Sequence, residues 1–338
     1  MKSYILQKAK KLTLENNPPR SVKSGEIKVK IELAAITSTD LSIFNGKLKC
    51  DLPLILGRQA VGVVSEVSSE NTMGLQKGNR VIIEGFLPCG KCYFCKTGQS
   101  GKCENMEVLG FTREGLFSDF AVVPASLAHV IPDHMSNATA LYTEYVSMAL
   151  NIIEKIKLRP GEHVAIMSAN KLGYILAQLI TYYQGIAIVI DNNQQQLDKL
   201  AEENINYTLN SKRNSWKENV SGITSGRMCE KVVYLTNAVL NFDDAVDICG
   251  INGTICIAGF LPATDTCSLG EVHNKQLTIV SKQTSQGNFS AAINMLATRT
   301  VNVTRLSGET FRFAELPEKM LAMTQEEAKY GGIHFKID

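Results

Sequence analysis

The N-terminal part of the chain is dominated by short runs in which apolar and polar residues alternate. Such runs, separated by turn residues, occur at Ile27–Leu33, Leu54–Ile55, Val61–Val67 and Arg80–Ile83. A period of two is typical of half-buried β-strands. Long helical periodicity does not begin before about Ala138. We therefore expect a small all-β barrel over this region.

The pattern changes after Ala138, where segments of helical spacing alternate with short apolar runs. Helices are predicted at Thr143–Lys157, Gly173–Tyr183, Gln194–Glu203 and Phe242–Ile248, and strands at His163–Met167, Ala187–Ile190, Lys231–Leu235, Gly253–Ala258 and Leu277–Ser281. This alternation predicts an α/β fold with a doubly wound parallel sheet and right-handed crossovers. Beyond residue 283 we expect a helix at Phe289–Ala297, followed by a tail, ending in 329–336, with room to return to the first domain.

The bulk composition is that of an ordinary globular protein. The 338 residues are 44% hydrophobic and 20% charged, and 35 basic against 33 acidic residues leave a net charge of +2. No block of like charge favours a nucleic-acid partner. The N-terminal segment lacks a signal-peptide core, and no stretch approaches the roughly 18 apolar residues of a membrane helix. We therefore expect a cytoplasmic protein of two domains, with no membrane partner.

Four cysteines in one loop give the densest chemical signal in the sequence. They are Cys89, Cys92, Cys95 and Cys103, in the pattern C-x2-C-x2-C-x7-C. Thiolates at this spacing can enclose one tetrahedral cation, and Zn²⁺ fits best because it prefers four soft or borderline ligands. Two disulfides or free cysteines are the alternatives. The other cysteines are scattered, as buried thiols in a reducing compartment would be.

The barrel, the cysteine loop and the doubly wound domain, in this order, resemble the zinc-type medium-chain dehydrogenase/reductase family of alcohol, sorbitol and threonine dehydrogenases. The likeness runs from about Ile27 to about Leu296, with matching stretches at Ala35–Asp40, Leu54–Gly62, Thr143–Leu150, Pro160–Leu179 and Asp191–Ala201. It implies a GroES-like barrel domain over residues 1–145 and 283–338, with a structural zinc lobe at 86–108. It also implies a Rossmann nucleotide-binding domain over residues 146–282, and a homodimer or homotetramer joined through the sheet of that domain.

The resemblance implies a second, catalytic zinc, and here the sequence departs from the family pattern. The family stretch C-G-T-D or C-x-S-D reads Thr37-Ser38-Thr39-Asp40, and G-H-E reads Gly57-Arg58-Gln59. The glutamate of the polyol-type E-P-L-S stretch remains as Glu144. A hydroxyl and a carboxamide are poor zinc ligands, a guanidinium is none, and one carboxylate cannot retain the ion alone. We therefore predict that the catalytic metal is absent.

Arg58 places a permanent cation where the resemblance puts a doubly charged ion. We predict that Arg58 forms a charge-assisted pair with Asp40, Glu144 or both, because these carboxylates are retained near the same site. The alternative is an arginine that points to solvent from the edge of the barrel, which is the commoner environment of this side chain.

The turn after strand His163–Met167 occupies the place of the dinucleotide-binding motif G-x-G-x-x-G. It reads Ser168-Ala169-Asn170-Lys171-Leu172-Gly173, so only the third glycine remains, and its role is close packing of helix on strand. Asn170 tolerates positive φ better than most residues, although its side chain occupies phosphate space. Lys171 is expected to compensate as a cation facing the phosphates.

Asp191 is expected at the end of strand Ala187–Ile190, eighteen residues after Gly173. A carboxylate at this point hydrogen-bonds the adenosine ribose and repels a 2′-phosphate, so NAD(H) is expected rather than NADP(H). A solvated aspartate at a strand end is the alternative. Together these residues predict a nucleotide cleft of reduced affinity.

The first of three possible functions is an NAD-dependent oxidoreductase that reduces a carbonyl or an activated alkene without a catalytic zinc. Its catalytic residues would be drawn from Thr39, Arg58, Asp40 and Glu144, with Thr39 and Arg58 as the electrophiles. Tyr142 and Tyr145, which flank Glu144, are weaker candidates because they can equally well pack.

The second function is that of a non-catalytic descendant, which binds a small molecule or serves as a partner subunit and keeps only the structural zinc. The third is a zinc alcohol or polyol dehydrogenase with a rebuilt metal site. The candidate ligands for such a site are Cys50, His129 and His134, and both histidines are expected in a loop at Ala128–Met135. Each is more commonly a surface or packing residue.

Overall fold

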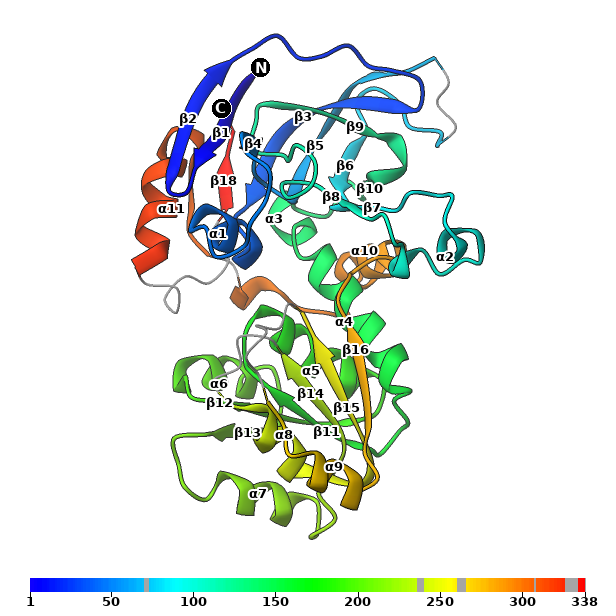
Figure 1. Cartoon of the computed structure of the whole chain (residues 1–338), viewed down its shortest axis with the longest axis vertical. Helices are drawn as coiled ribbons and strands as arrows, with labels where there is room; N and C mark the ends of the chain where they lie inside the picture. The colour runs from blue at the N-terminus through cyan, green and yellow to red at the C-terminus, as the bar shows by residue number, and fades with distance from the viewer. Residues whose placement is uncertain (70–72, 236–239, 260–265, 307, 326–333, 338) are drawn as a thin grey trace. The chain divides into compact units, whose positions relative to one another are not determined.

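The computed structural model divides the chain into two compact units (Figure 1). Unit 1 comprises Met1–Glu144, Phe289–Arg299 and Leu306–Asp338, and unit 2 comprises Tyr145–Asn288 and Thr300–Arg305. The structure describes residues 1–69, 73–235, 240–259, 266–306, 308–325 and 334–337.

Unit 1 is built on a seven-stranded, mainly antiparallel sheet with the order β10-β6-β5-β3-β18-β17, in which β9 also pairs with β3. The strands are β3 (Glu26–Ala35), β5 (Gln59–Val67), β6 (Arg80–Ile83), β9 (Phe120–Pro124), β10 (Ala128–Val130), β17 (Thr310–Arg312) and β18 (His334–Lys336). Ile27, Val29 and Ile31 are fully buried on one face of β3. Their alternation is the physical basis of the strand prediction, because successive side chains of a strand point to opposite faces.

Smaller elements complete unit 1. A three-stranded sheet has the order β2-β1-β4, and β7 pairs with β8. The strands are β1 (Lys2–Lys8), β2 (Lys11–Asn16), β4 (Leu54–Ile55), β7 (Phe86–Leu87) and β8 (Glu107–Val108). The helices are α1 (Ser38–Phe44), α2 (Tyr93–Lys96), α3 (Asn137–Ala140), α10 (Phe289–Ala297), α11 (Leu316–Gln325) and the 3₁₀ turns η1 (Ser100–Lys102), η2 (Ala125–Leu127) and η4 (Phe313–Glu315).

The C-terminal strand β18 pairs antiparallel with β3, with His334 opposite Ala35. The expected return of the tail to the first domain is therefore confirmed. The expected tail also includes residues 329–333, which lie outside the described residues. Phe335 is fully buried and stacks on Phe313 at 5.6 Å between ring centroids, so the returning strand contributes to the core of unit 1.

Unit 2 contains a six-stranded parallel sheet with the order β13-β12-β11-β14-β15-β16. Its strands are β11 (His163–Met167), β12 (Ile186–Asp191), β13 (Tyr207–Asn210), β14 (Cys229–Leu235), β15 (Cys249–Ala258) and β16 (Thr278–Lys282). Its helices are α5 (Lys171–Tyr182), α6 (Gln194–Ala201), α7 (Trp216–Ile223), α8 (Phe242–Ile248) and α9 (Leu269–Asn274). Two helices cross a division between the units along the sequence: α4 (Thr143–Ile156) begins in unit 1, and η3 (Thr304–Leu306) begins in unit 2. The predicted α/β fold class is confirmed.

Sequence patterns missed the short or polar elements and misplaced one segment. Strand β13 and helix α7 were not predicted, because a four-residue edge strand and an eight-residue helix give only a short periodic signal. His129 lies in strand β10, so the loop expected at Ala128–Met135 is wrong for its first residues. None of the helices in the described part of the chain is both long and apolar enough to cross a membrane.

Candidate functional site

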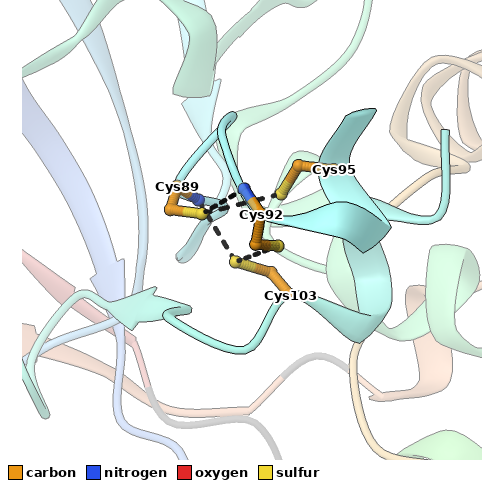
Figure 2. A group of neighbouring side chains, drawn as sticks. All are labelled: Cys89, Cys92, Cys95 and Cys103. Carbon is orange, nitrogen blue, oxygen red and sulfur yellow. Dashed lines mark hydrogen bonds between the residues drawn. The ribbon is translucent and has the colours of Figure 1, made fainter. Parts of the chain in front are cut away.

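The four loop cysteines converge in unit 1, as Figure 2 shows. The Sγ atoms of Cys89, Cys92, Cys95 and Cys103 all lie within 4.8 Å of one another. The Sγ–Sγ distances are 4.0 Å between Cys89 and Cys95 and 3.9 Å between Cys92 and Cys103, far beyond a disulfide bond of about 2.05 Å. Four convergent thiols with no bond between them are a donor set that fits a tetrahedral zinc ion.

The backbone of the lobe prepares one of these sulfurs for a metal. Hydrogen bonds from the backbone N–H groups of Lys91 and Cys92 lower the pKa of the Cys89 thiol to about 6. Thiolate is the form that binds metal, so this arrangement favours the ligand at neutral pH. Burial instead raises the pKa of Cys95 to about 12, a cost that a bound cation would offset.

A second group of polar residues surrounds Arg58 in unit 1. Arg58 directly precedes β5, and Glu144 lies in the first turn of α4. Arg58 Nη2 lies 2.9 Å from Glu144 Oε1, and both side chains are largely buried, with exposed fractions of 13% and 11%. The predicted pairing of Arg58 with Glu144 is therefore present, and the alternative of an outward-pointing arginine is wrong.

Glu144 is held from both sides. Its second oxygen, Oε2, accepts a hydrogen bond of 2.9 Å from Gln59 Nε2. Arg58 Nη1 also lies 3.5 Å from Thr39 Oγ1, which is at the limit of a hydrogen bond. Glu144 therefore lies between the guanidinium of Arg58 and the carboxamide of Gln59, and the Thr39 hydroxyl lies beside the guanidinium.

The stem of Arg58 lies against Gly85 and Phe86. A Cβ atom on Gly85 would lie 2.1 Å from Arg58 Cγ, so only glycine leaves room for this path of the side chain. The Arg58 guanidinium lies 5.2 Å from the centroid of the Phe86 ring, within the range of a cation–π contact. Arg58 Nε is buried without a hydrogen-bond partner among the described residues.

Asp40 is buried beside this group but is used differently. Its Oδ2 accepts hydrogen bonds from Thr37 N at 2.8 Å and Thr37 Oγ1 at 2.5 Å, and its Oδ1 accepts one from Gly57 N at 3.1 Å. Burial raises the pKa of Asp40, against the opposing effect of these donors and of the nearby Arg58 charge. Asp40 thus closes a capping box on α1 and ties it to Gly57.

The residues around Arg58 do not fit a catalytic zinc ion. The guanidinium is directly paired with Glu144, and an arginine offers no lone pair to a metal. The proposed replacement ligands are engaged elsewhere. His129 Nε2 lies 2.9 Å from Glu84 Oε2, and His134 Nε2 lies 3.3 Å from the carbonyl of Ala297. The described residues form one cluster of at least three potential metal ligands, and it is the cysteine lobe.

In unit 2, the turn between β11 and α5 differs from expectation at Asn170. The left-handed backbone falls on Ser168, with φ of 140°, whereas Asn170 has φ of −65°. Asn170 is the N-cap of α5, and its Oδ1 accepts a hydrogen bond of 3.0 Å from Gly173 N. The expected use of its tolerance for positive φ is therefore wrong, since an N-cap takes extended backbone.

Gly173 has the packing role predicted from the sequence. A Cβ atom there would lie 2.0 Å from the carbonyl oxygen of Ser168. The helix can approach the end of the strand only because this side chain is absent. Gly173 thus determines the shape of the turn, which in a doubly wound sheet lies at the carboxyl ends of the strands, where ligands bind.

Asp191 ends β12, as expected, but its carboxylate already has partners in its own chain. Oδ2 accepts hydrogen bonds from Ala169 N at 2.7 Å and Ser168 Oγ at 3.4 Å, and Oδ1 accepts one from Asn193 N at 2.8 Å. The side chain is buried, not solvated at the strand end. Asp191 therefore stabilises the turn, and Oδ1, which accepts one hydrogen bond, keeps a lone pair with which a ribose hydroxyl can bond.

Lys171, the first residue of α5, has its Nζ 5.8 Å from the centroid of the Tyr145 ring. Burial lowers the pKa of Lys171 to about 8. Of the two tyrosines beside Glu144, Tyr142 is fully buried and donates a hydrogen bond of 2.6 Å to the carbonyl of Leu306. Sequence reasoning missed the roles of Gln59 and Gly85, for which the sequence gives no local signal.

The fold and these sites define a two-unit α/β protein, with a thiol metal lobe in an antiparallel unit and a doubly wound parallel sheet in the other. Residues 23–133 match the family model of the alcohol dehydrogenase GroES-like domain, and residues 172–298 match that of zinc-binding dehydrogenases. The chain belongs to the zinc-type medium-chain dehydrogenase/reductase family.

The relatives are dehydrogenase-like oxidoreductases. The chain is 26% identical to a zinc-type alcohol dehydrogenase-like protein of Haemophilus influenzae, over 98% of this chain and 97% of that protein. It is 28% identical to an L-threonine 3-dehydrogenase of Edwardsiella ictaluri, over 75% and 76% of the two chains. The structure of RspB from Escherichia coli, complexed with NADH, shares the fold with a TM-score of 0.88 at 24% identity, over 99% of both chains.

Proposed function

We propose that the chain is an NAD(H)-dependent oxidoreductase that reduces a carbonyl group or an activated alkene without a catalytic zinc. The supporting observation is the buried Arg58–Glu144 pair, at 2.9 Å, in the place that the family resemblance assigns to the metal. Reduction of a carbonyl develops negative charge on oxygen, and preorganised donors stabilise that charge. Arg58 supplies a fixed cation, and the Thr39 hydroxyl beside it supplies a second polar group.

The carboxylates in this proposal position other groups and do not react. Both oxygens of Glu144 are engaged, one by Arg58 and one by Gln59. Asp40 is engaged by Thr37 and by the backbone of Gly57. Glu144 orients the guanidinium, and Asp40 holds the start of α1, which contains Thr39, against the turn before Arg58.

Unit 2 is proposed to bind the dinucleotide at the carboxyl ends of its strands. The residues that would hold it are Gly173, Asn170 and Ser168 in the turn, Asp191 at the ribose, and Lys171 near the phosphates. The likeness of the fold to RspB, which was solved with NADH, supports this site. When bound, the dinucleotide would supply the hydride, and the protein would supply orientation and charge stabilisation.

Three measurements on the purified chain test this function. We expect one zinc per chain by elemental analysis, saturable NADH binding by fluorescence titration, and oxidation of NADH in the presence of aldehyde, quinone or enone probes. Two zinc ions per chain would favour an alcohol or polyol dehydrogenase with a rebuilt site. One zinc without NADH binding or turnover would reject the oxidoreductase.

A non-catalytic descendant is the second candidate, and one observation favours it. The turn Ser168–Gly173 donates hydrogen bonds to the Asp191 carboxylate and has a further hydrogen bond between Gly173 and Asn170, so these polar groups have partners without a ligand. Such a protein would keep the zinc lobe as a structural centre and use the remaining surface for a small molecule or a partner subunit.

We further propose that the chain forms a homodimer through the edge of the unit 2 sheet, in keeping with the family resemblance. Strand β16 ends that sheet, and exposed apolar side chains, Ile251, Leu269 and Ile279, lie on β15, α9 and β16. Ile279→Lys is expected to convert a dimer into a monomer in light scattering, and an unchanged mass would reject this interface. The free thiols of the cysteines agree with the expected cytoplasmic location.

A further inference from the structure

The cysteines of the lobe at residues 86–108 differ in exposure from those in the parallel sheet of unit 2. The lobe cysteines, Cys89, Cys92, Cys95 and Cys103, are free and half-buried. The sheet cysteines, Cys229, Cys249 and Cys256, are free and have no exposed surface. Thiols enclosed in apolar surroundings are inert, whereas partly exposed thiols react with oxidants. The lobe therefore gathers four thiols that an oxidant can reach.

Positive charge surrounds these four thiols. Lys91, Lys96 and Lys102 each adjoin one of the lobe cysteines in the sequence, and all three lysines are exposed. The same segment contains two glutamates, and one of them, Glu107, is paired with Arg113 at 2.7 Å. Electropositive and partly exposed surroundings of this kind are typical of cysteines that take part in redox chemistry.

The sulfurs of the lobe form two close pairs. Sγ of Cys89 lies 4.0 Å from Sγ of Cys95, and Sγ of Cys92 lies 3.9 Å from Sγ of Cys103 (Figure 2). No cysteine belongs to both pairs. These distances suit the ligands of one ion, and they are about 2 Å longer than an S–S bond. Each pair can therefore serve as two metal ligands or as one disulfide, but not as both at once.

The lobe has little apolar packing of its own. None of the residues 87–108 is buried, and this includes every residue of α2 and η1. At its base, Phe86 pairs with Val108 and Leu87 with Glu107, where β7 meets β8. A short segment that buries little apolar surface needs a metal ion or disulfides to hold one conformation. The conformation of the lobe therefore depends on the cross-links between its sulfurs.

We propose that the lobe is a site of reversible oxidation, at which a peroxide converts the four zinc-binding thiolates into two disulfides and the metal is released. The disulfides are Cys89–Cys95 and Cys92–Cys103, which join the closest sulfurs. Because they replace the metal as cross-links, the lobe stays closed in the zinc form and in the oxidised form. It opens only when it is both reduced and free of metal.

The chemistry of each disulfide balances with one peroxide. One thiolate attacks a peroxide oxygen, the O–O bond breaks, and a sulfenic acid forms with loss of hydroxide. The second thiolate of the pair then attacks the sulfenic sulfur, forms the S–S bond and displaces a second hydroxide. Two electrons pass from the two sulfurs to the peroxide. This reaction uses no NADH, so it goes beyond the proposed function and does not depend on it.

The first test treats the zinc-loaded full chain with excess hydrogen peroxide. The chromogenic chelator 4-(2-pyridylazo)resorcinol should detect the loss of about one zinc per chain, and a sample without peroxide should keep its metal. Dithiothreitol followed by zinc should restore both the free thiols and the metal content. Retention of zinc under peroxide, or a chain that takes up no zinc at all, would overturn the inference.

The second test identifies the products by alkylation, digestion and mass spectrometry. Trypsin cleaves after Lys91, Lys96 and Lys102, and chymotrypsin cleaves between Cys92 and Cys95 at Tyr93 or Phe94, so the two enzymes together place the four cysteines on separate peptides. We expect the two disulfides of the proposal. The buried thiols of the sheet in unit 2 are the internal control and should remain reduced. Sulfinic or sulfonic acids in place of disulfides would overturn the inference, and any other pairing would overturn the assignment of the pairs.

The third test compares three states of the lobe by limited proteolysis. The zinc form and the peroxide-oxidised form should both resist cleavage within residues 86–108. The chain that is stripped with EDTA in the presence of a reducing agent should be cleaved there. Oxidised protein that is cleaved as readily as the stripped protein would overturn the exchange of one cross-link for the other. Because none of the three tests measures NADH binding or turnover, failure here leaves the proposed oxidoreductase untouched.

Discussion

The cysteine lobe and the Arg58 group are two polar centres of unit 1 that differ in the source of their positive charge. The lobe presents four sulfurs within 4.8 Å of one another and keeps a complete set of metal donors. The Arg58 group contains a cation that is part of the chain and is paired with one carboxylate. Each centre contains buried or half-buried groups that can carry a negative charge, and a positive charge is needed to offset the cost of removing that charge from water.

The difference lies in where that positive charge comes from. The lobe depends on an ion taken from solution, so its stability varies with metal and with pH. The Arg58 group contains its own counter-charge, so it is complete as soon as the chain folds. A metal offers an open Lewis-acid position, whereas a guanidinium offers only hydrogen bonds and charge.

The largest effect is expected from removing one sulfur of the lobe. Cys103→Ser should reduce the zinc content from about one per chain to near zero, because a structural site needs all four ligands and zinc binding contributes about 10–16 kcal/mol in zinc-finger peptides. Elemental analysis and limited proteolysis of residues 86–108 measure the change. Cys50→Ser is the control and should retain the metal. Full zinc content in Cys103→Ser would show that the lobe is not a four-thiolate site.

The next effect is the loss of the carboxylate partner of Arg58. Glu144→Ala should lower the free energy of unfolding by about 3–5 kcal/mol in urea denaturation, since it leaves a largely buried cation unpaired. The double variant Arg58→Met with Glu144→Leu should recover most of that loss. As a control, Glu315→Ala breaks an exposed pair with Arg312 and should cost much less stability than Glu144→Ala. Equal losses in Glu144→Ala and Glu315→Ala would mean that burial does not strengthen the Arg58 pair.

A smaller effect tests the space that Arg58 occupies. Gly85→Ala should destabilise the protein by about 1–3 kcal/mol, because the new Cβ would lie 2.1 Å from Arg58 Cγ. In an Arg58→Ala background the same change should cost much less, and this double-mutant cycle isolates the contact. Gly222→Ala, in α7 with no atom within 4 Å of its Cβ, is the control and should not destabilise the protein, because alanine is the better helix former. An additive cycle would rule out the contact as the reason for glycine at position 85.

The smallest effect concerns a pair near the surface, Arg20 and Glu26, whose side chains are 41% and 13% exposed. The hydrogen bond from Arg20 lowers the pKa of Glu26 below its ordinary value of 4.5. A depressed carboxylate pKa contributes stability that is present above the unfolded pKa and is lost as pH falls through the folded value. Relative to Glu26→Gln, wild type should lose at most about 1 kcal/mol below pH 4.5, after allowance for solvent screening. A difference that grows as pH rises above neutrality would contradict this assignment.

Sequence patterns predicted the elements that carry strong periodicity, and they did so for local reasons. Strand β11 and helices α8 and α10 have the predicted bounds, because hydrophobic spacing and flanking turn residues encode them within a few positions. The cysteine lobe was predicted in full, since its ligands lie in one short loop. Strand β13 and helix α7, with four and eight residues, were missed because each gives only a short periodic signal.

The pair between Arg58 and Glu144 was predicted only with the help of the family resemblance, because the partners are far apart in the sequence. The bond between Gln59 and Glu144 spans 85 positions, and no spacing rule connects such residues. Asn170 was misjudged for a related reason, since the sequence shows a missing glycine but not which neighbour takes the positive φ. The structure gives that backbone conformation to Ser168.

Residue type and local period were sufficient to predict the fold class and the four-thiol lobe, and the family resemblance added the expectation that zinc ligands are missing at positions 37 and 58. Only the tertiary structure decided that Glu144 is shared between Arg58 and Gln59, that Gly85 leaves room for the arginine, and that Lys171 lies over Tyr145. These contacts join residues that are far apart in the sequence, and a sequence pattern does not contain the distances between their side chains.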